Sequence, residues 1–249
     1  MSFVKAAAHN LIGLIFPNRC LMCEAPLDPA RSSPLCPGHA REIVRVEPPV
    51  CSKCGRKLFG ESVEALVCSE CRSGRICYDV GYSAYVFAGP IRDLVHFFKY
   101  RRRRYLQSFL GGLLLDYVRG RADIAPSDVI IPVPLHWWGY CRRGFNQAID
   151  LAKPLSKHFH IPIMKRNLRR VRHTRRQVGL SRVERRANIK NAFEVSRPAK
   201  LAGKSILLID DVITTGATLN ECARVLKQAG VSRITILTLA QATGLAAKP

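Results

Sequence analysis

The sequence predicts an α/β domain with a parallel sheet flanked by helices, preceded by a small metal-binding domain. Seven of the ten cysteines lie between positions 20 and 71, and together with His39 they form four pairs whose members are separated by two residues. From about Tyr78 onward, apolar runs alternate with amphipathic stretches, as in sheets with crossover helices. Ten basic and seven acidic residues lie in 1–75, against thirty and eleven in 76–249. We therefore expect the 249 residues to form two domains, 1–75 and 76–249.

The formal net charge of +22 favours polyanionic partners such as nucleic acid or phosphorylated metabolites. No apolar run approaches the roughly 20 residues that cross a bilayer, so we expect a cytoplasmic protein with no transmembrane segment. Apolar residues from Phe3 to Phe16 recur at helical spacing before Pro17, which predicts an amphipathic helix. We expect this helix to pack against the body of the protein. Contact with a membrane surface, and hence membrane association, is the alternative.

Four pairs of potential metal ligands share the same spacing: Cys20 and Cys23, Cys36 and His39, Cys51 and Cys54, and Cys68 and Cys71. This spacing lets both side chains of a tight turn point at one ion, about 2.3 Å from each sulfur. The pattern predicts two zinc ribbons, with one structural zinc bound by the first four residues and one by the last four; interleaved pairing stays open. A disulfide framework would need an oxidising compartment and would leave Cys77, Cys141 and Cys222 unpaired. Closed four-ligand sites leave no position for catalysis.

Three apolar runs in the second domain predict buried strands at 129–133, 205–209 and 232–239. Between the last two, residues 218–229 carry apolar side chains on one helical face, and Gly230 follows as a stop signal. A strand, a loop, a helix and a strand in this order predict a parallel pair with a crossover helix. Such sheets bind ligands at the carboxyl ends of their strands.

The strand at 205–209 is followed by two acids and a small hydroxylated loop, Asp210-Asp211-Val212-Ile213-Thr214-Thr215-Gly216-Ala217-Thr218. The loop at 214–218 can wrap a phosphate with backbone N–H groups and threonine hydroxyls, because Gly216 permits a tight turn and the next helix presents its positive end. The carboxylates of Asp210 and Asp211 would face the sugar, as binders of a diol or of magnesium. The window therefore predicts a site for a ribose 5-phosphate.

This window resembles the phosphoribosyl pyrophosphate (PRPP) motif of type I phosphoribosyltransferases at every defining position. The resemblance implies a type I phosphoribosyltransferase-like sheet. It also implies that Asp210 and Asp211 are the catalytic acids, which hold the ribose hydroxyls, and that magnesium accompanies the pyrophosphate. The 5-phosphate would be held by five consecutive residues, Thr214, Thr215, Gly216, Ala217 and Thr218.

Upstream, the strand at 129–133 runs into Pro134 and Leu135 and then into a segment rich in hydrogen-bond donors. This segment resembles the pyrophosphate loop of the same superfamily, in which Pro134 and Leu135 belong to the PRPP-binding turn. The donors for a diphosphate would be Arg142, Arg143, Asn146 and Gln147, since arginine suits bidentate phosphate contacts. For any one of these side chains, a basic helix start on the surface is the alternative.

The strings Pro132-Val133-Pro134-Leu135-His136 and Arg143-Gly144-Phe145-Asn146-Gln147 are similar to those of the ComF family, also called the ComFC or GntX family, as is the double zinc ribbon. In that family Thr174, Gln177 and Arg185 would belong to a flexible segment that closes over bound substrate. The resemblance implies a PRPP-binding protein that acts in DNA uptake and natural transformation, with single-stranded DNA and competence helicase-type proteins as partners. The chain ends soon after Leu239, which leaves little material for the base-recognising hood of many nucleotide-salvage enzymes.

Two basic segments could form a track for single-stranded DNA, because backbone phosphates need positive charge and exposed aromatic rings can stack on unpaired bases. Residues 165–190 hold eleven basic residues against one acid, and residues 99–104 hold five basic residues beside Phe97, Phe98, Tyr100 and Tyr105. A solvated basic helix face with core aromatic residues is the alternative.

The sequence leaves two functions open. In one, the chain is a DNA-processing factor whose sugar-phosphate pocket senses its ligand or gates the processing of DNA. In the other, it is an active phosphoribosyltransferase of nucleotide or related metabolism with an unidentified acceptor, which displaces pyrophosphate from the anomeric carbon. Magnesium and Arg142 or Arg143 would then stabilise the negative charge on the departing pyrophosphate. Asp210 or Asp211 would lie near the ribose, which gains positive charge. No residue is an obvious general base for an acceptor.

Overall fold

The computed structural model describes residues 19–28, 33–59, 66–100, 105–121, 124, 127–174 and 181–243, apart from the side chains of Arg142 and Arg182. The amphipathic helix expected before Pro17, the basic residues at 101–104 and Gln177 lie outside these residues. Within the described ranges, no helix combines the length and the apolar character needed to cross a membrane.

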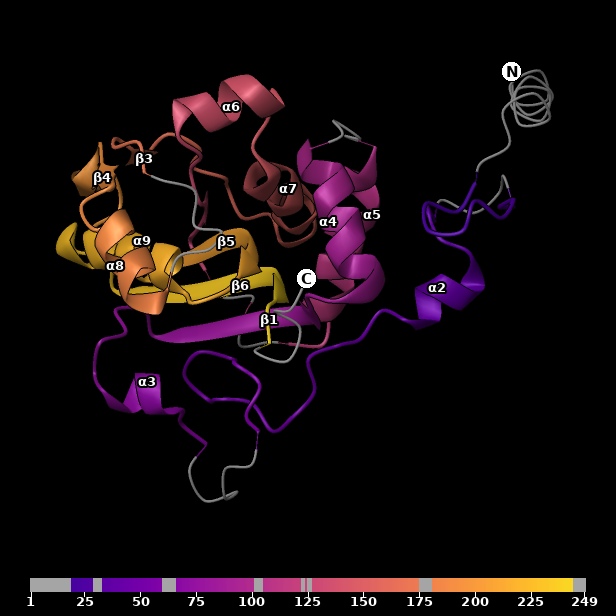
Figure 1. Cartoon of the computed structure of the whole chain (residues 1–249). Helices are drawn as coiled ribbons and strands as arrows, with labels where there is room; N and C mark the ends of the chain where they lie inside the picture. Colours follow the sequence, from indigo (N-terminus) through magenta and orange to yellow (C-terminus); the bar gives the residue numbers. More distant parts are fainter. Residues whose placement is uncertain are drawn as a thin grey trace.

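Four parallel strands form the central sheet, in the order β1 (Val80–Val86), β6 (Arg233–Gln241), β5 (Ser205–Ile213) and β2 (Val129–Pro132) (Figure 1). β5 and β6 are parallel neighbours joined by α9 (Ala217–Gln228), which confirms the predicted unit of strand, helix and strand. β5 extends beyond the apolar run to Ile213, because the residues after Ile209 continue to pair with β6. The two acids therefore lie on the strand itself, at its carboxyl end.

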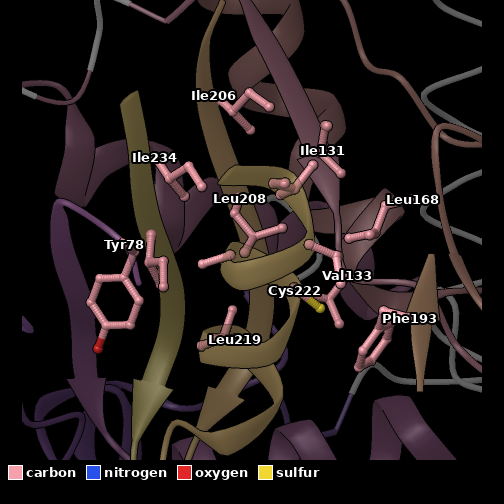
Figure 2. Packing of buried hydrophobic residues seen from close by; sticks show 14 of the residues in the cluster. Tyr78, Ile131, Val133, Leu168, Phe193, Ile206, Leu208, Leu219, Cys222 and Ile234 are labelled. Atoms are coloured by element: carbon pink, nitrogen blue, oxygen red, sulfur yellow. The ribbon is translucent and has the colours of Figure 1, made fainter. Parts of the chain in front are cut away.

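Both faces of the sheet are buried, as is usual for parallel sheets. Alternate residues of β5 point to opposite sides, so that Ile206 and Leu208 pack against α9 and Leu207 packs on the other face. The other face is covered by α4 (Gly89–Tyr100), α5 (Leu106–Val118) and α7 (Gln147–Phe159). Figure 2 shows the α9 side, where Cys222 lies beside Val133 and Leu208, and Ile206 and Ile131 lie farther along the sheet.

Shorter elements complete the fold. α6 (Trp137–Arg143) follows β2, and α8 (Arg182–Ile189) lies in the chain between the antiparallel strands β3 (Leu168–Arg170) and β4 (Phe193–Val195). A single 3-10 turn, η1 (Pro198–Lys200), precedes β5. In the cysteine-rich region, α2 (Pro37–Arg41) and α3 (Ser69–Arg72) each begin directly after a cysteine.

The cysteine-rich region is joined to the sheet by hydrogen bonds. Residues 44–46 run along the outer edge of β1, where Val46 N donates to Ala84 O at 3.0 Å. The side-chain amide of Gln241, at the end of β6, donates to Gly55 O at 3.1 Å. Because these contacts cross the expected boundary, the division into 1–75 and 76–249 stays a prediction.

Candidate functional site

A cavity of about 1320 Å³ opens at the carboxyl ends of β2 and β5, which is where parallel sheets bind ligands. It is lined by segments that are distant in the sequence: the end of α4, the residues after β2, the segment after β3, α8 and the start of α9. Eleven of the predicted site residues line it: Pro134, Leu135, Arg143, Asn146, Gln147, Thr174, Arg185, Asp210, Asp211, Thr214 and Thr218.

The predicted phosphate loop separates this cavity from a second pocket. Thr215, Gly216 and Ala217 line the second pocket, which has a volume of about 330 Å³, whereas Thr214 and Thr218 line the first. Gln177 and the side chain of Arg142 lie outside the described residues, so their predicted roles stay predictions.

The loop at 214–218 leads directly into α9, whose twelve residues begin at Ala217, one residue earlier than the sequence predicted. Gly216 has a φ of 78°, a left-handed conformation that glycine adopts without strain. Thr215 Oγ1 accepts a hydrogen bond from Ala217 N at 3.4 Å. The first N–H groups of a helix have no partner within it, so a phosphate beside Thr214 and Thr218 would meet these donors at the positive end of α9.

The two acids meet a lysine from a distant part of the chain. Lys99, in the last turn of α4, donates from Nζ to Asp211 Oδ1 at 2.8 Å, and both side chains are largely buried. Burial and the negative charge of Asp211 raise the pKa of Asp210 to about 7, while the positive charge of Lys99 opposes this rise. The paired carboxylates offer oxygen atoms of the kind that a ribose diol or a magnesium ion binds.

Sequence reasoning placed Lys99 in a basic run and missed its position in the site. A signal was present, because Lys99 follows Val95 by four residues and therefore falls on the apolar stripe of α4 formed by Ile91, Val95 and Phe98. A charged residue on the buried face of a helix needs a partner. The sequence alone did not identify that partner as Asp211.

Four buried side-chain atoms around the cavity have no hydrogen-bond partner within the part of the chain that is described: His136 Nδ1, Arg143 Nε, Gln147 Nε2 and Arg170 Nε. Leaving a buried donor unpaired costs about 1–3 kcal/mol. Burial also lowers the pKa of Arg170, which means that its positive charge is poorly solvated. The arrangement indicates a ligand that accepts several hydrogen bonds and carries negative charge. Arg143 and Gln147 were predicted as donors, whereas Arg170 and His136 were not.

The segment expected to be a pyrophosphate loop is largely helical, which corrects the prediction. α6 covers it from Trp137 to Arg143 and ends at Gly144, whose φ of 77° closes the helix. Arg143 still faces the cavity, where its Nη1 donates to Gln147 Oε1 at 2.9 Å. Asn146 lines the cavity too, but its side-chain oxygen caps α7. Arg143 and Gln147 are therefore the predicted donors that are placed to meet a ligand.

The residues expected to flank a closing segment lie beside the cavity. Arg185 on α8 donates from Nη1 to Thr214 Oγ1 in the phosphate loop at 3.1 Å. Thr174 is buried and accepts a hydrogen bond from Arg170. A capping box of Ser181 and Glu184 begins α8. The closing motion itself stays a prediction.

The cysteine pairs form two separate clusters: Cys20, Cys23, Cys36 and His39 in one, and Cys51, Cys54, Cys68 and Cys71 in the other. In each cluster the ligand atoms lie within 4.8 Å of one another, which confirms the sequential grouping and excludes the interleaved one. Around a tetrahedral zinc, sulfurs at about 2.3 Å from the ion are roughly 3.8 Å apart. The Sγ atoms of Cys23 and Cys36 are 3.9 Å apart, and those of Cys54 and Cys68 are 3.7 Å apart. Thiolate and imidazole ligands at these distances fit two structural zinc ions.

Comparisons with known proteins agree with this architecture. A family model described as "Phosphoribosyl transferase domain" matches residues 145–248, and one described as "Double zinc ribbon domain" matches residues 11–72. Competence protein F of Haemophilus influenzae is 34% identical over 90% of this chain and 97% of its own length. DNA utilization protein YhgH of Escherichia coli is 31% identical over 91% of this chain and 98% of its own length. Competence protein ComFC of Bacillus subtilis is 27% identical over 82% of this chain and 83% of its own length. The chain therefore belongs to the ComF family of phosphoribosyltransferase-like proteins with an N-terminal double zinc ribbon.

Proposed function

We propose that the cavity binds PRPP and that the chain acts in DNA uptake and utilization as a PRPP-binding protein that handles single-stranded DNA. The observation that carries the first part is a set of buried polar atoms without a partner among the described residues. Arg143 Nε, Gln147 Nε2 and Arg170 Nε are donors, and the role of His136 Nδ1 depends on the tautomer of the ring. They lie around a cavity that also contains the start of α9 and two carboxylates. PRPP has the complementary chemistry, since it has phosphate groups at both ends and a diol between them.

In this proposal the 5-phosphate binds at the loop of residues 214–218 and the pyrophosphate meets Arg143 and Arg170. Asp210 and Asp211 hold the ribose hydroxyls. The same carboxylates fit magnesium, because hard cations prefer oxygen ligands. When bound, magnesium would neutralise part of the pyrophosphate charge. Lys99 keeps the charge of Asp211 balanced when the cavity holds no cation.

Single-stranded DNA is proposed as the second ligand on two grounds. The relatives named competence protein F, competence protein ComFC and DNA utilization protein YhgH resemble this chain over most of its length. The region 76–249 carries thirty basic residues against eleven acidic ones, which is the charge that a phosphate backbone needs. Competence helicase-type proteins are the proposed protein partners.

Transfer of phosphoribose to an acceptor is the second candidate. It is favoured by Arg143 and Arg170, which would meet the pyrophosphate as its bond to the anomeric carbon breaks. In such a step the acceptor forms the new bond to that carbon, and pyrophosphate leaves with the electron pair. Asp210 and Asp211 would stabilise the positive charge that develops on the ribose.

Calorimetry with PRPP and magnesium, with and without a single-stranded oligonucleotide, tests the proposal. We expect magnesium-dependent binding of PRPP that is lost in Asp210→Asn/Asp211→Asn, and single-strand affinity that falls with salt at a slope of about −0.7 per phosphate contacted. Asp128→Asn, at the far end of β5 near Ser205, is the matched control. Absence of PRPP binding would reject the first part, and a flat salt dependence would reject the second. Magnesium-dependent release of pyrophosphate with a candidate acceptor would favour the enzyme.

A further inference from the structure

Exposed aromatic side chains lie on α6 and at the end of α4, the two helices whose residues Trp138 and Tyr100 line the cavity. Trp137, Trp138 and Tyr140 of α6 are 57%, 59% and 51% exposed, and Tyr100 at the end of α4 is 55% exposed. Tyr100 and Trp138 also line the cavity itself. We call these four residues the aromatic rim. In Figure 1, α6 lies on the outer side of the molecule, away from the sheet and from the cysteine-rich region.

Folding does not account for the aromatic rim. None of the described side chains of α6 is buried, so the two tryptophans add little to the core. Their rings stack on each other instead, with centroids 4.3 Å apart and an angle of 29° between planes. Large aromatic surfaces that stay in water are unfavourable, and contiguous exposed patches mark interaction sites. The aromatic rim is therefore suited to a partner that offers flat, apolar faces.

The charges around the aromatic rim narrow the class of partner. The guanidinium of Arg143 lies 5.3 Å from the ring centroid of Tyr100, so a positive charge lies beside one ring of the aromatic rim. Below the rim, Arg170 lines the cavity. Flat faces next to positive charge complement a nucleic acid, which presents bases and phosphates together. A second copy of this chain fits poorly, because two molecules of net charge +22 repel.

We propose that the aromatic rim is a stacking platform for unpaired bases, and that it places a single-stranded nucleic acid across the mouth of the PRPP cavity. This inference rests on the single-strand part of the proposed function and adds where the bases bind. Bases in a duplex are already stacked on one another, so only a single strand offers them to Trp137 and Trp138. Basic residues within the described ranges 165–174 and 181–190 would supply the phosphate contacts, and the aromatic rim would supply the base contacts.

The chain offers a direct reporter for this proposal, because both of its tryptophans belong to the aromatic rim. We expect a short oligothymidylate to quench the intrinsic tryptophan fluorescence. An abasic oligonucleotide of the same length has the same phosphates without bases, and a duplex has stacked bases; both should quench little. Binding is followed separately by the fluorescence anisotropy of a labelled oligonucleotide, so that affinity and base stacking are measured independently.

Variants of the full chain complete the test. Trp137→Ala/Trp138→Ala should weaken oligothymidylate binding roughly tenfold while binding of the abasic strand changes little. Trp137→Phe/Trp138→Phe should restore most of the affinity, since phenylalanine also stacks. Phe59→Ala is the matched control, because Phe59 is equally exposed, at 53%, in the cysteine-rich region. It should leave both affinities unchanged.

The possible failures are distinguishable. Binding of the labelled strand without quenching, or with the same affinity in the alanine double variant, would overturn the platform and leave the proposed function standing. Absence of single-strand binding in the wild type would overturn both. A fluorescence change that depends on protein concentration without any oligonucleotide would show that copies of the chain cover the aromatic rim, and this too would overturn the proposal.

Discussion

Arg56, next to the second cysteine cluster, donates from Nη2 to the backbone oxygen of Thr215 in the phosphate loop at 3.4 Å. The same guanidinium pairs through Nη1 with Glu70 Oε2 at 3.3 Å, and Glu70, which lies between two cysteines of that cluster, also pairs with Arg186 on α8. The zinc ribbon therefore contacts the loop from the side of the second pocket, which Glu70, Arg186 and Thr215 line together. A cysteine cluster whose four ligands would leave zinc no open coordination position is in this way connected to the proposed ligand site.

Glu70→Gln should lower the affinity for PRPP while leaving the zinc content unchanged. Glutamine removes the charge that holds Arg56 and Arg186 together, and an ion pair of this kind contributes about 1 kcal/mol. We expect the dissociation constant from calorimetry to rise about fivefold. Cys54→Ser, which removes a ligand of the second zinc, should have a larger effect.

Cys23→Ser is the control for this prediction. It removes a ligand of the first cluster, which lies beside α2 and apart from β5 and α9 (Figure 1). We expect it to lower the zinc content without changing PRPP affinity. Equal affinities in wild type, Glu70→Gln and Cys54→Ser would mean that the ribbon does not support the loop.

The sequence predicted those parts of the site that depend on local spacing. The two-residue gaps between cysteines identify the pairs of metal ligands, although the grouping of these pairs into two sites came from the structure. The order of strand, loop and helix fixes the position of Thr214 and Thr218. Contacts between distant segments could not be predicted. The pairing of Lys99 with Asp211 depends on how α4 packs on the sheet, and the contact of Arg56 with Thr215 depends on the docking of the ribbon. The helix α6 was expected only as the alternative to a loop, because Pro132 and Pro134 before it and Gly139 within it are typical of turns.

Lys99→Met should weaken PRPP binding and change its pH dependence. In the wild type, Asp210 has a pKa of about 7, so we expect the affinity for PRPP with magnesium to fall as the pH falls through about 7. Lys99 opposes the rise in that pKa, so its removal should raise the pKa further and move the loss of affinity to higher pH. Calorimetry over a range of pH measures this shift.

The matched control is Lys153→Met, which removes a lysine that pairs with Asp150 at 2.5 Å on α7. It should leave the pH profile unchanged. A Lys99→Met protein with the pH profile of the wild type would contradict the assigned contact between the lysine and the acids.

Asp210→Asn should stabilise the ligand-free protein at neutral and high pH. The carboxyl of Asp210 ionises near 3.8 in the unfolded chain and near 7 in the folded one, so the folded state binds the proton more tightly. Its ionisation therefore costs stability as the pH rises from about 3.8 to about 7, and the cost is constant above that. We expect a gain on the order of 1–3 kcal/mol above pH 7 that vanishes toward pH 4.

Chemical denaturation at several pH values measures this gain, and Asp128→Asn supplies a control of opposite sign. Hydrogen bonds from Ser205 lower the pKa of Asp128, so its ionised form stabilises the folded state and its removal should lower stability at neutral pH. Loss of stability in Asp210→Asn at high pH would contradict the raised pKa.

Gly55→Ala should undock the second zinc ribbon from the sheet. Gly55 has a φ of 67°, and a Cβ at this position would lie 2.4 Å from the carbonyl oxygen of Gly81 in β1. The left-handed conformation costs a non-glycine residue about 1–2 kcal/mol, and the overlap with backbone adds about 1–3 kcal/mol.

Gly74→Ala separates the two effects, because Gly74 has a φ of 69° and none of the described atoms beyond its own chain neighbours lies within 4 Å of its added Cβ. We expect Gly74→Ala to lower the free energy of unfolding by the cost of the left-handed conformation alone and to leave PRPP binding unchanged. Gly55→Ala should lower it by the sum and should also weaken PRPP binding, since the contact of Arg56 with Thr215 depends on the docked ribbon; equal unfolding free energies in the two variants would contradict the close approach of Gly55 to β1.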